Sequence, residues 1–153
     1  MEHILTALRY IAAEFDDVEI EYPIHMNPKV RDIAGRIFEG CGNIHLIEPL
    51  QYQPFVNLMA RSYFIVTDSG GMQEEAPSLG KPVLVVRRET ERPEAIEAGT
   101  VKLAGVERDT IYAMAKELLT DKDAYDSMAH AANPYGDGTA CDQIIAALKA
   151  KLK

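Results

Sequence analysis

The chain has 153 residues, which predicts one domain over 1–153 with a buried core, and its 47% hydrophobic content is ordinary for a globular protein. A formal net charge of −8 argues against a nucleic-acid-binding surface, but it is compatible with a local pocket for a small phosphorylated ligand. Apolar runs are shorter than the ~20 residues that cross a bilayer and no signal peptide is evident, so we expect a cytoplasmic protein without a membrane partner. Cys41 and Cys141 lack metal-ligand spacing, and we expect no metal or other cofactor.

The first predicted element is a helix over 4–15, and candidate strands follow it along the chain. Apolar and charged residues alternate over 18–24, which is typical of a strand with one buried face. Further strands are expected at 44–47, 63–66, 82–86 and 100–103. The segments 63–66 and 82–86 have no polar face, which predicts central parallel strands covered on both sides.

Helical patterns separate these strands. After the helix 4–15, further helices are expected at 52–61, 93–98, 109–119, 124–132 and 142–152. One more helix is expected to begin at the glycines 70–71. Pro93 and Gly99 suit the two ends of the short helix, and Asp109 is expected to be an N-cap. This alternation predicts a doubly wound, Rossmann-like α/β domain with parallel strands, and ligands of such folds bind beyond the carboxyl ends of the strands.

A glycine pair follows the third predicted strand. Ser69, Gly70 and Gly71 stand between that strand and a helix, where open backbone lets a ligand approach the first-turn N–H groups. Ser69 adds a hydroxyl donor, and the positive end of the helix dipole favours an anion. The loop is a candidate diphosphate site, and the alternative is a tight turn that serves packing alone.

Two charged residues near this loop are further candidates. Glu75 lies about one turn into the helix, and its carboxylate can accept hydrogen bonds from both hydroxyls of a ribose. The helix dipole also favours an acid there without any ligand. Arg92 follows the fourth strand, and its planar guanidinium suits a phosphate. The alternative is that the charged stretch 87–94 is only a solvated surface.

Phe55 and His25 are candidates near the ends of other predicted strands. The Phe55 ring can stack on a base, or it can belong to the apolar face of its helix. His25 closes the first strand and can meet an anionic group, or it can make only a local hydrogen bond.

Taken together, these motifs resemble one family. The segment 67–83, Thr-Asp-Ser-Gly-Gly-Met-Gln-Glu-Glu-Ala-Pro-Ser-Leu-Gly-Lys-Pro-Val, looks like the signature of the non-hydrolysing UDP-N-acetylglucosamine 2-epimerases. The likeness continues in order through 22–28, 49–55, 90–94, 97–100 and 133–138, so it covers nearly the whole chain. Arg88 departs from it, because family members usually carry an acidic residue there.

The resemblance implies a UDP site in the C-terminal half of a two-domain enzyme with the glycosyltransferase-B arrangement. Residues 69–71 would hold the diphosphate and Glu75 the ribose hydroxyls, with Phe55 beside the uracil and Arg92 at the phosphates. His25 falls where some bacterial members bind a second UDP-GlcNAc as an allosteric activator.

The resemblance also implies an activity, the interconversion of UDP-GlcNAc and UDP-ManNAc by elimination and re-addition of UDP. The family's catalytic carboxylates lie in an N-terminal domain, so we expect no catalytic residue here and an inactive isolated chain. The family's first strand, ending in His-Arg-Arg-Glu-Asn, would precede residue 1. Its absence predicts either that the strands 18–24 and 63–66 pair directly or that another chain or segment fills the space between them.

Two alternatives stay open, a non-catalytic nucleotide-sugar-binding module and half of a glycosyltransferase of the same fold. The Glu-Glu-Ala-Pro motif at 74–77 and Glu-Arg-Pro at 91–93 favour the epimerases. The expected partners are UDP-GlcNAc or UDP and the absent N-terminal domain, and a homodimer with a second copy of the chain is left open.

Overall fold

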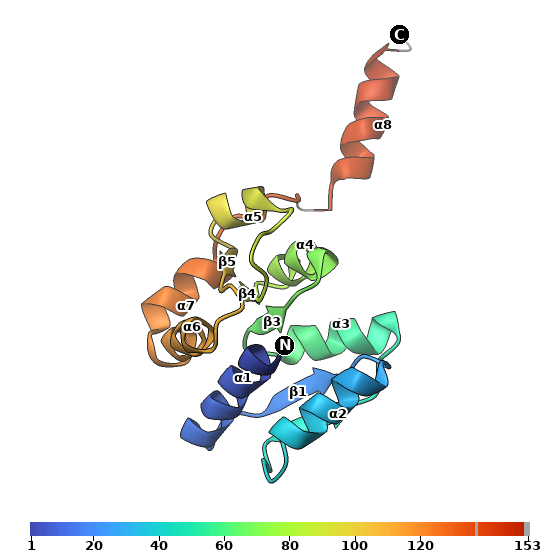
Figure 1. The fold of residues 1–153 in the computed structure, drawn as a ribbon. Helices are drawn as coiled ribbons and strands as arrows, with labels where there is room; N and C mark the ends of the chain where they lie inside the picture. The colour runs from blue at the N-terminus through green and yellow to red at the C-terminus, as the bar shows by residue number, and fades with distance from the viewer. Residues whose placement is uncertain (137, 152–153) are drawn as a thin grey trace.

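A computed structural model describes residues 1–136 and 138–151, in which helices and strands alternate (Figure 1). The helices are α1 (Glu2–Glu14), α2 (Pro28–Ile37), α3 (Tyr52–Arg61), α4 (Gly70–Ser78), α5 (Pro93–Glu97), α6 (Arg108–Thr120), α7 (Lys122–Ala129) and α8 (Ala140–Lys151). The strands are β1 (Ile20–Pro23), β2 (Ile44–Ile47), β3 (Ile65–Thr67), β4 (Val83–Val85) and β5 (Val101–Leu103). The predicted elements are confirmed, most strands being shorter than expected, and the end of the predicted helix 142–152 lies outside the described residues.

Two helix starts differ from the prediction. The helix α2 is not among the predicted elements, although its start has a clear signal: the Asn27 side chain accepts the N–H of Lys29 at 3.0 Å, and Pro28 occupies the first turn. The N-cap of α6 is Glu107, and Asp109 lies inside the first turn instead. An acid in that turn is still favoured by the helix dipole, which explains why either position fits the sequence.

The strand pairs are parallel, as predicted, but the strands form two sheets. β1 pairs with β2, with Ile20 opposite Ile44, and a separate sheet has the order β3-β4-β5, with Ile65 opposite Val83. Direct pairing of β1 with β3, one of the two alternatives, is therefore wrong. β1 and β3 each keep one edge unpaired within the described part of the chain. The other alternative, a strand from another chain or segment between β1 and β3, stays a prediction.

The central strand of the larger sheet is β4, and β3 lies at its edge. Val83, Leu84 and Val85 are fully buried, whereas all the residues of β3 are only half-buried. The prediction that 63–66 is a central strand is wrong within the described part of the chain, because no described strand pairs with the second edge of β3. Both faces of the strand are nevertheless covered, since Phe64 and Val66 pack against one core cluster and Ile65 packs against another.

The helix α1 connects the two sheets. Leu5 and Ala12 lie in the core cluster beside β1 and β2, while Ala7 and Ile11 lie in another cluster with Leu84 of β4. One helix therefore contributes to both hydrophobic cores. This shared packing joins the sheets into a Rossmann-like α/β unit, although no described strand bridges them.

The helix α8 projects away from the remainder of the molecule (Figure 1). None of its described side chains is buried, and Ile144, Ile145 and Leu148 are 59%, 48% and 55% exposed. Within residues 1–136 and 138–151, no helix is both long and apolar enough to span a membrane.

Candidate functional site

The carboxyl end of β3 leads directly into the first turn of α4. Ser69 is the N-cap residue, and its N–H donates to Thr67 Oγ1 at 3.0 Å, which turns the chain sharply after the strand. Gly70 and Gly71 begin the helix, so their N–H groups are among those that have no acceptor within the helix. Together with the helix dipole, these donors make the turn suitable for an anion.

The conformation of the chain itself does not require the two glycines. Neither has a positive φ, and a Cβ on Gly70 would lie 3.8 Å from Glu91 Oε2. A Cβ on Gly71 would lie 3.8 Å from Glu75 Oε1 and 4.0 Å from Ser69 Oγ, which are ordinary van der Waals distances. The alternative of a turn that serves packing alone is therefore not supported, and open backbone at a helix N-terminus suits close approach by a ligand.

The loop 87–92, which follows β4, folds back onto the start of α4. Thr90 Oγ1 donates to Gln73 Oε1 at 2.6 Å, and Gln73 Nε2 donates to the carbonyl oxygen of Ser69 at 3.3 Å. The prediction of a solvated surface holds for Arg88 and Glu89, which are exposed. It is wrong for Thr90, whose hydroxyl is bonded to a fully buried side chain.

Arg92 is fixed through both its backbone and its side chain. Its N–H donates to Thr90 Oγ1 at 3.0 Å, its Nε donates to Glu74 Oε1 at 2.5 Å, and its Nη1 donates to the carbonyl oxygen of Glu91 at 3.1 Å. The hydrogen bond with Glu74 raises the pKa of the Arg92 guanidinium above its usual value, so the group is a constant positive charge. Its side chain is 34% exposed and thus accessible to a ligand.

Tyr135 lies near the pair formed by Glu74 and Arg92. Its ring packs against the core cluster that contains Ala76, and among the described residues its buried hydroxyl has no hydrogen-bond partner of good geometry. Burial, and then the neighbouring carboxylate of Glu94, raise the pKa of Tyr135 to about 12, so this hydroxyl is neutral near pH 7.

Of the other predicted residues, Glu75 lies at the glycine turn, whereas Phe55 and His25 lie elsewhere in the fold. Glu75 stands beside the glycine turn, with Oε1 close to Gly71. Phe55 is half-buried on α3, and His25 is exposed after β1, where its Nδ1 accepts the N–H of Asn27 at 3.1 Å. Among the described residues, neither makes a hydrogen bond or ring contact with the glycine turn. The local hydrogen bond predicted for His25 is confirmed, and its allosteric role stays a prediction.

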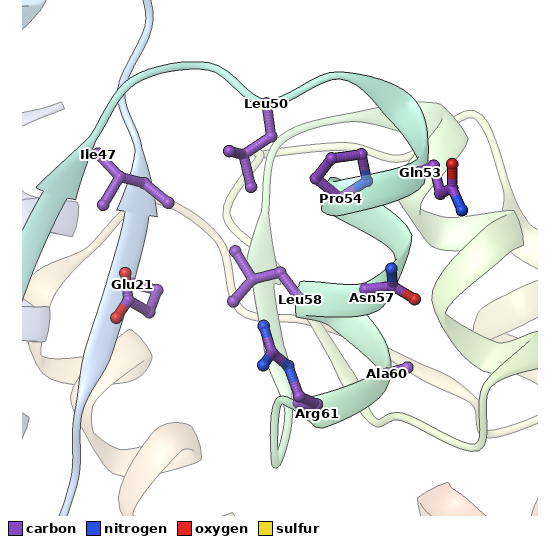
Figure 2. A pocket seen from close by; sticks show the side chains of 9 residues that line it. All are labelled: Glu21, Ile47, Leu50, Gln53, Pro54, Asn57, Leu58, Ala60 and Arg61. Carbon is purple, nitrogen blue, oxygen red and sulfur yellow. The ribbon is translucent and has the colours of Figure 1, made fainter.

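A pocket of about 720 Å³ lies in another place, between β1 and α3 (Figure 2). Glu21 and Ile47 face Leu50, Leu58 and Arg61 across it. None of the predicted UDP-binding residues lines this pocket. We place the candidate site at the start of α4 instead, because the groups that bind anions gather there.

Gln73, Glu74 and Thr90 organise the site but are not among the predicted residues. Gln73 shares a helix face with Ala76 and Pro77, three and four positions later, so the helical period puts its amide in the core. That pattern could have identified it. Glu74 and Thr90 have no local signal, because their partners Arg92 and Gln73 lie 18 and 17 residues away in the sequence.

Comparison with known proteins places the chain among sugar-nucleotide epimerases. The family model for UDP-N-acetylglucosamine 2-epimerase matches residues 1–149. The UDP-N-acetylglucosamine 2-epimerase of Bacillus subtilis is 57% identical over 145 residues, which are 95% of this chain and 38% of that protein. The epimerase of Neisseria meningitidis bound to UDP-GlcNAc has a TM-score of 0.93 at 45% identity and covers 98% of this chain and 41% of its own. An S. aureus structure with UDP has a TM-score of 0.91 at 50% identity and covers 99% and 41%.

The chain spans about two fifths of the length of the curated relatives that it matches. The solved relatives share its fold, which confirms the Rossmann-like α/β class. A glycosyltransferase half-domain is not supported, because the matching family is that of the epimerases. The chain belongs to the UDP-N-acetylglucosamine 2-epimerase family.

Proposed function

We propose that the chain is the UDP-binding half of an enzyme that interconverts UDP-GlcNAc and UDP-ManNAc. The observation that carries this proposal is the meeting of the glycine turn at Ser69 with the loop that holds Arg92. It joins helix N–H groups and a guanidinium at the carboxyl ends of neighbouring parallel strands, where ligands of such folds bind. Solved relatives bound to UDP-GlcNAc and to UDP support the choice of ligand.

Each part of the nucleotide is assigned to one group. The diphosphate is bound by the N–H groups of Gly70 and Gly71, the Ser69 hydroxyl and Arg92. Glu75, which stands beside the turn, accepts hydrogen bonds from the ribose hydroxyls. Phe55 supplies a ring for the uracil from α3, and His25 belongs to a second, allosteric UDP-GlcNAc site.

These groups act on the departing UDP. Elimination breaks the bond between C1 of the sugar and the diphosphate oxygen, and negative charge develops on the diphosphate. Helix N–H groups and a fixed guanidinium stabilise that charge without rearrangement. Removal and return of the proton at C2 need acid–base groups, which we assign to an N-terminal domain in the part of the relatives that this chain does not match.

We also propose that this N-terminal domain covers α8, whose apolar side chains are exposed here. Sedimentation of the purified chain tests the assignment, and we expect a monomer. A dimer that dissociates when Ile144 and Leu148 are both replaced by Glu would assign α8 to a homodimer interface instead.

Calorimetric titration of the chain with UDP tests the site. Arg92→Ala and Glu75→Ala should each weaken binding about 10- to 100-fold, because each removes a charged hydrogen-bonding group. Arg88→Ala is the matched control; it removes an exposed arginine from the same loop and should change the Kd by less than about threefold. Equal affinities for all variants would contradict the placement of UDP at α4.

NMR with UDP-GlcNAc tests the assignment of UDP binding to this chain and of the acid–base groups to the N-terminal domain. The isolated chain should form no UDP-ManNAc, and co-expression with an N-terminal half of a relative should restore turnover. Turnover by the chain alone would place the acid–base groups here. UDP binding without turnover in the reconstituted protein would favour the non-catalytic binding module.

A further inference from the structure

Gln73 is a polar side chain with no exposed surface, on the face of α4 that packs into the core. A buried carboxamide lowers stability unless both its oxygen and its nitrogen find partners. Both do: Oε1 accepts from Thr90 and Nε2 donates to Ser69. The orientation of the carboxamide is set by the carbonyl oxygen of Ser69, which can only accept and therefore faces Nε2. Oε1 then faces Thr90, whose hydroxyl donates its proton to Gln73 while Oγ1 accepts the N–H of Arg92.

The bonds form a continuous chain between two elements of the proposed site. It runs from the N–H of Arg92 to Thr90, from Thr90 to Gln73, and from Gln73 to the carbonyl oxygen of Ser69. One end is the residue that precedes the glycine turn, and the other carries the guanidinium. The pairing of β3 with β4 and the bond from Arg92 to Glu74 also connect the two elements, and this chain of bonds adds a direct link between the Arg92 backbone and Ser69.

We propose that Gln73 and Thr90 are positioning residues that hold Arg92 in register with the glycine turn. This inference rests on the proposed function, since the register matters most when both elements bind one diphosphate. Hydrogen bonds in series polarise one another, and the loss of one leaves buried groups unpaired on both sides of it. Removal of the Thr90 hydroxyl therefore breaks the link from the Arg92 backbone to Gln73 and leaves the side-chain bond to Glu74 to hold Arg92 against α4, without removing any group that touches the ligand.

The test compares Thr90→Val, which keeps the shape but lacks the hydroxyl, with Thr90→Ser, which keeps the hydroxyl. Without ligand, NMR measures solvent exchange of the Arg92 Nε–H, which is slowed by its bond to Glu74. We expect exchange to be faster in Thr90→Val and native in Thr90→Ser. Thr90→Ala replaces Thr90→Val if the valine variant does not fold. Native exchange in the variant that lacks the hydroxyl would overturn the proposal.

Calorimetry with UDP then separates positioning from a general effect on folding. Thr90→Val should weaken UDP about tenfold in the native background, and it should have no further effect when Arg92 is already alanine. Thr90→Ser should bind within about twofold of the native chain. An equal loss in both backgrounds would show that Thr90 does not act through Arg92 and would overturn the inference. If the native chain binds no UDP while the exchange result holds, the proposed function fails and the positioning of Arg92 stands.

Discussion

The Nε of Arg92 donates a hydrogen bond of 2.5 Å to Oε1 of Glu74, across a sequence separation of 18 residues. A carboxylate at this place has two opposing effects on a bound diphosphate. Its charge repels the phosphates, and its hydrogen bond orients the guanidinium that attracts them.

Glu74→Gln distinguishes the two effects. We expect UDP binding to weaken about 3- to 10-fold, because a neutral amide oxygen accepts a weaker hydrogen bond from the guanidinium, and this weaker orientation outweighs the removal of one partly exposed negative charge. Glu89→Gln is the control, since it removes an exposed charge from the loop without touching Arg92, and it should leave the affinity unchanged or slightly higher. Tighter binding by Glu74→Gln in calorimetry would mean that repulsion dominates.

Gly71→Ala should separate folding from binding. The added Cβ meets only ordinary contacts at 3.8 Å and 4.0 Å, and alanine is a better helix former by about 1 kcal/mol. The midpoint of urea unfolding should therefore stay the same or rise, while UDP affinity falls at least about tenfold because the methyl group blocks close approach. Gly35→Ala is a matched control: it lies inside α2, far in sequence from the site, with no atom within 4 Å of its Cβ position. Native UDP affinity in Gly71→Ala would contradict the diphosphate assignment.

Ionisation of Tyr135 should lower the free energy of unfolding at alkaline pH. Its pKa is about 12 in the folded chain and about 10 when unfolded, so between these values the folded state binds the extra proton. Its contribution is complete below about pH 10 and is lost as the pH rises through about 12. Urea unfolding at about pH 8 and pH 11 should give a smaller decline for Tyr135→Phe than for the native chain.

The same variant should cost little at neutral pH, because within residues 1–136 and 138–151 the Tyr135 hydroxyl makes no hydrogen bond of good geometry that phenylalanine would lose. Tyr52→Phe, at a residue that is 69% exposed, is the control and should keep the native pH dependence. An identical decline in the native chain and in Tyr135→Phe would refute this account of Tyr135.

Ile11→Ala should lower the free energy of unfolding by about 2–4 kcal/mol, as is typical for loss of a large buried aliphatic side chain. Ile11 is 2% exposed on α1, the helix that packs against both sheets. Urea denaturation measures the effect, and Ile144→Ala, at an exposed position, should change stability by less than about 0.5 kcal/mol. Similar losses at both positions would mean that α1 does not have the structural role assigned to it.

Local patterns in the sequence predicted most of the secondary structure and part of the site. The period of apolar residues gave the strands and helices, since it depends only on which face of an element is buried. The glycine turn at Ser69 was likewise visible, because a strand, two glycines and a helix stand in direct succession. The helix α2 was overlooked despite an equally local signal at Asn27 and Pro28.

Strand pairing and the contacts between distant side chains depend on how the whole chain packs. That β3 is an edge strand follows from which strands lie beside it, and a strand's own residues do not carry that information. In the same way, Arg92 is placed against α4 by Glu74, Thr90 and Gln73, through contacts between residues 17 and 18 positions apart. The elements, the family resemblance and the glycine turn thus follow from local sequence patterns. The split sheet and the fixed arginine depend on long-range contacts, which form only when the chain packs.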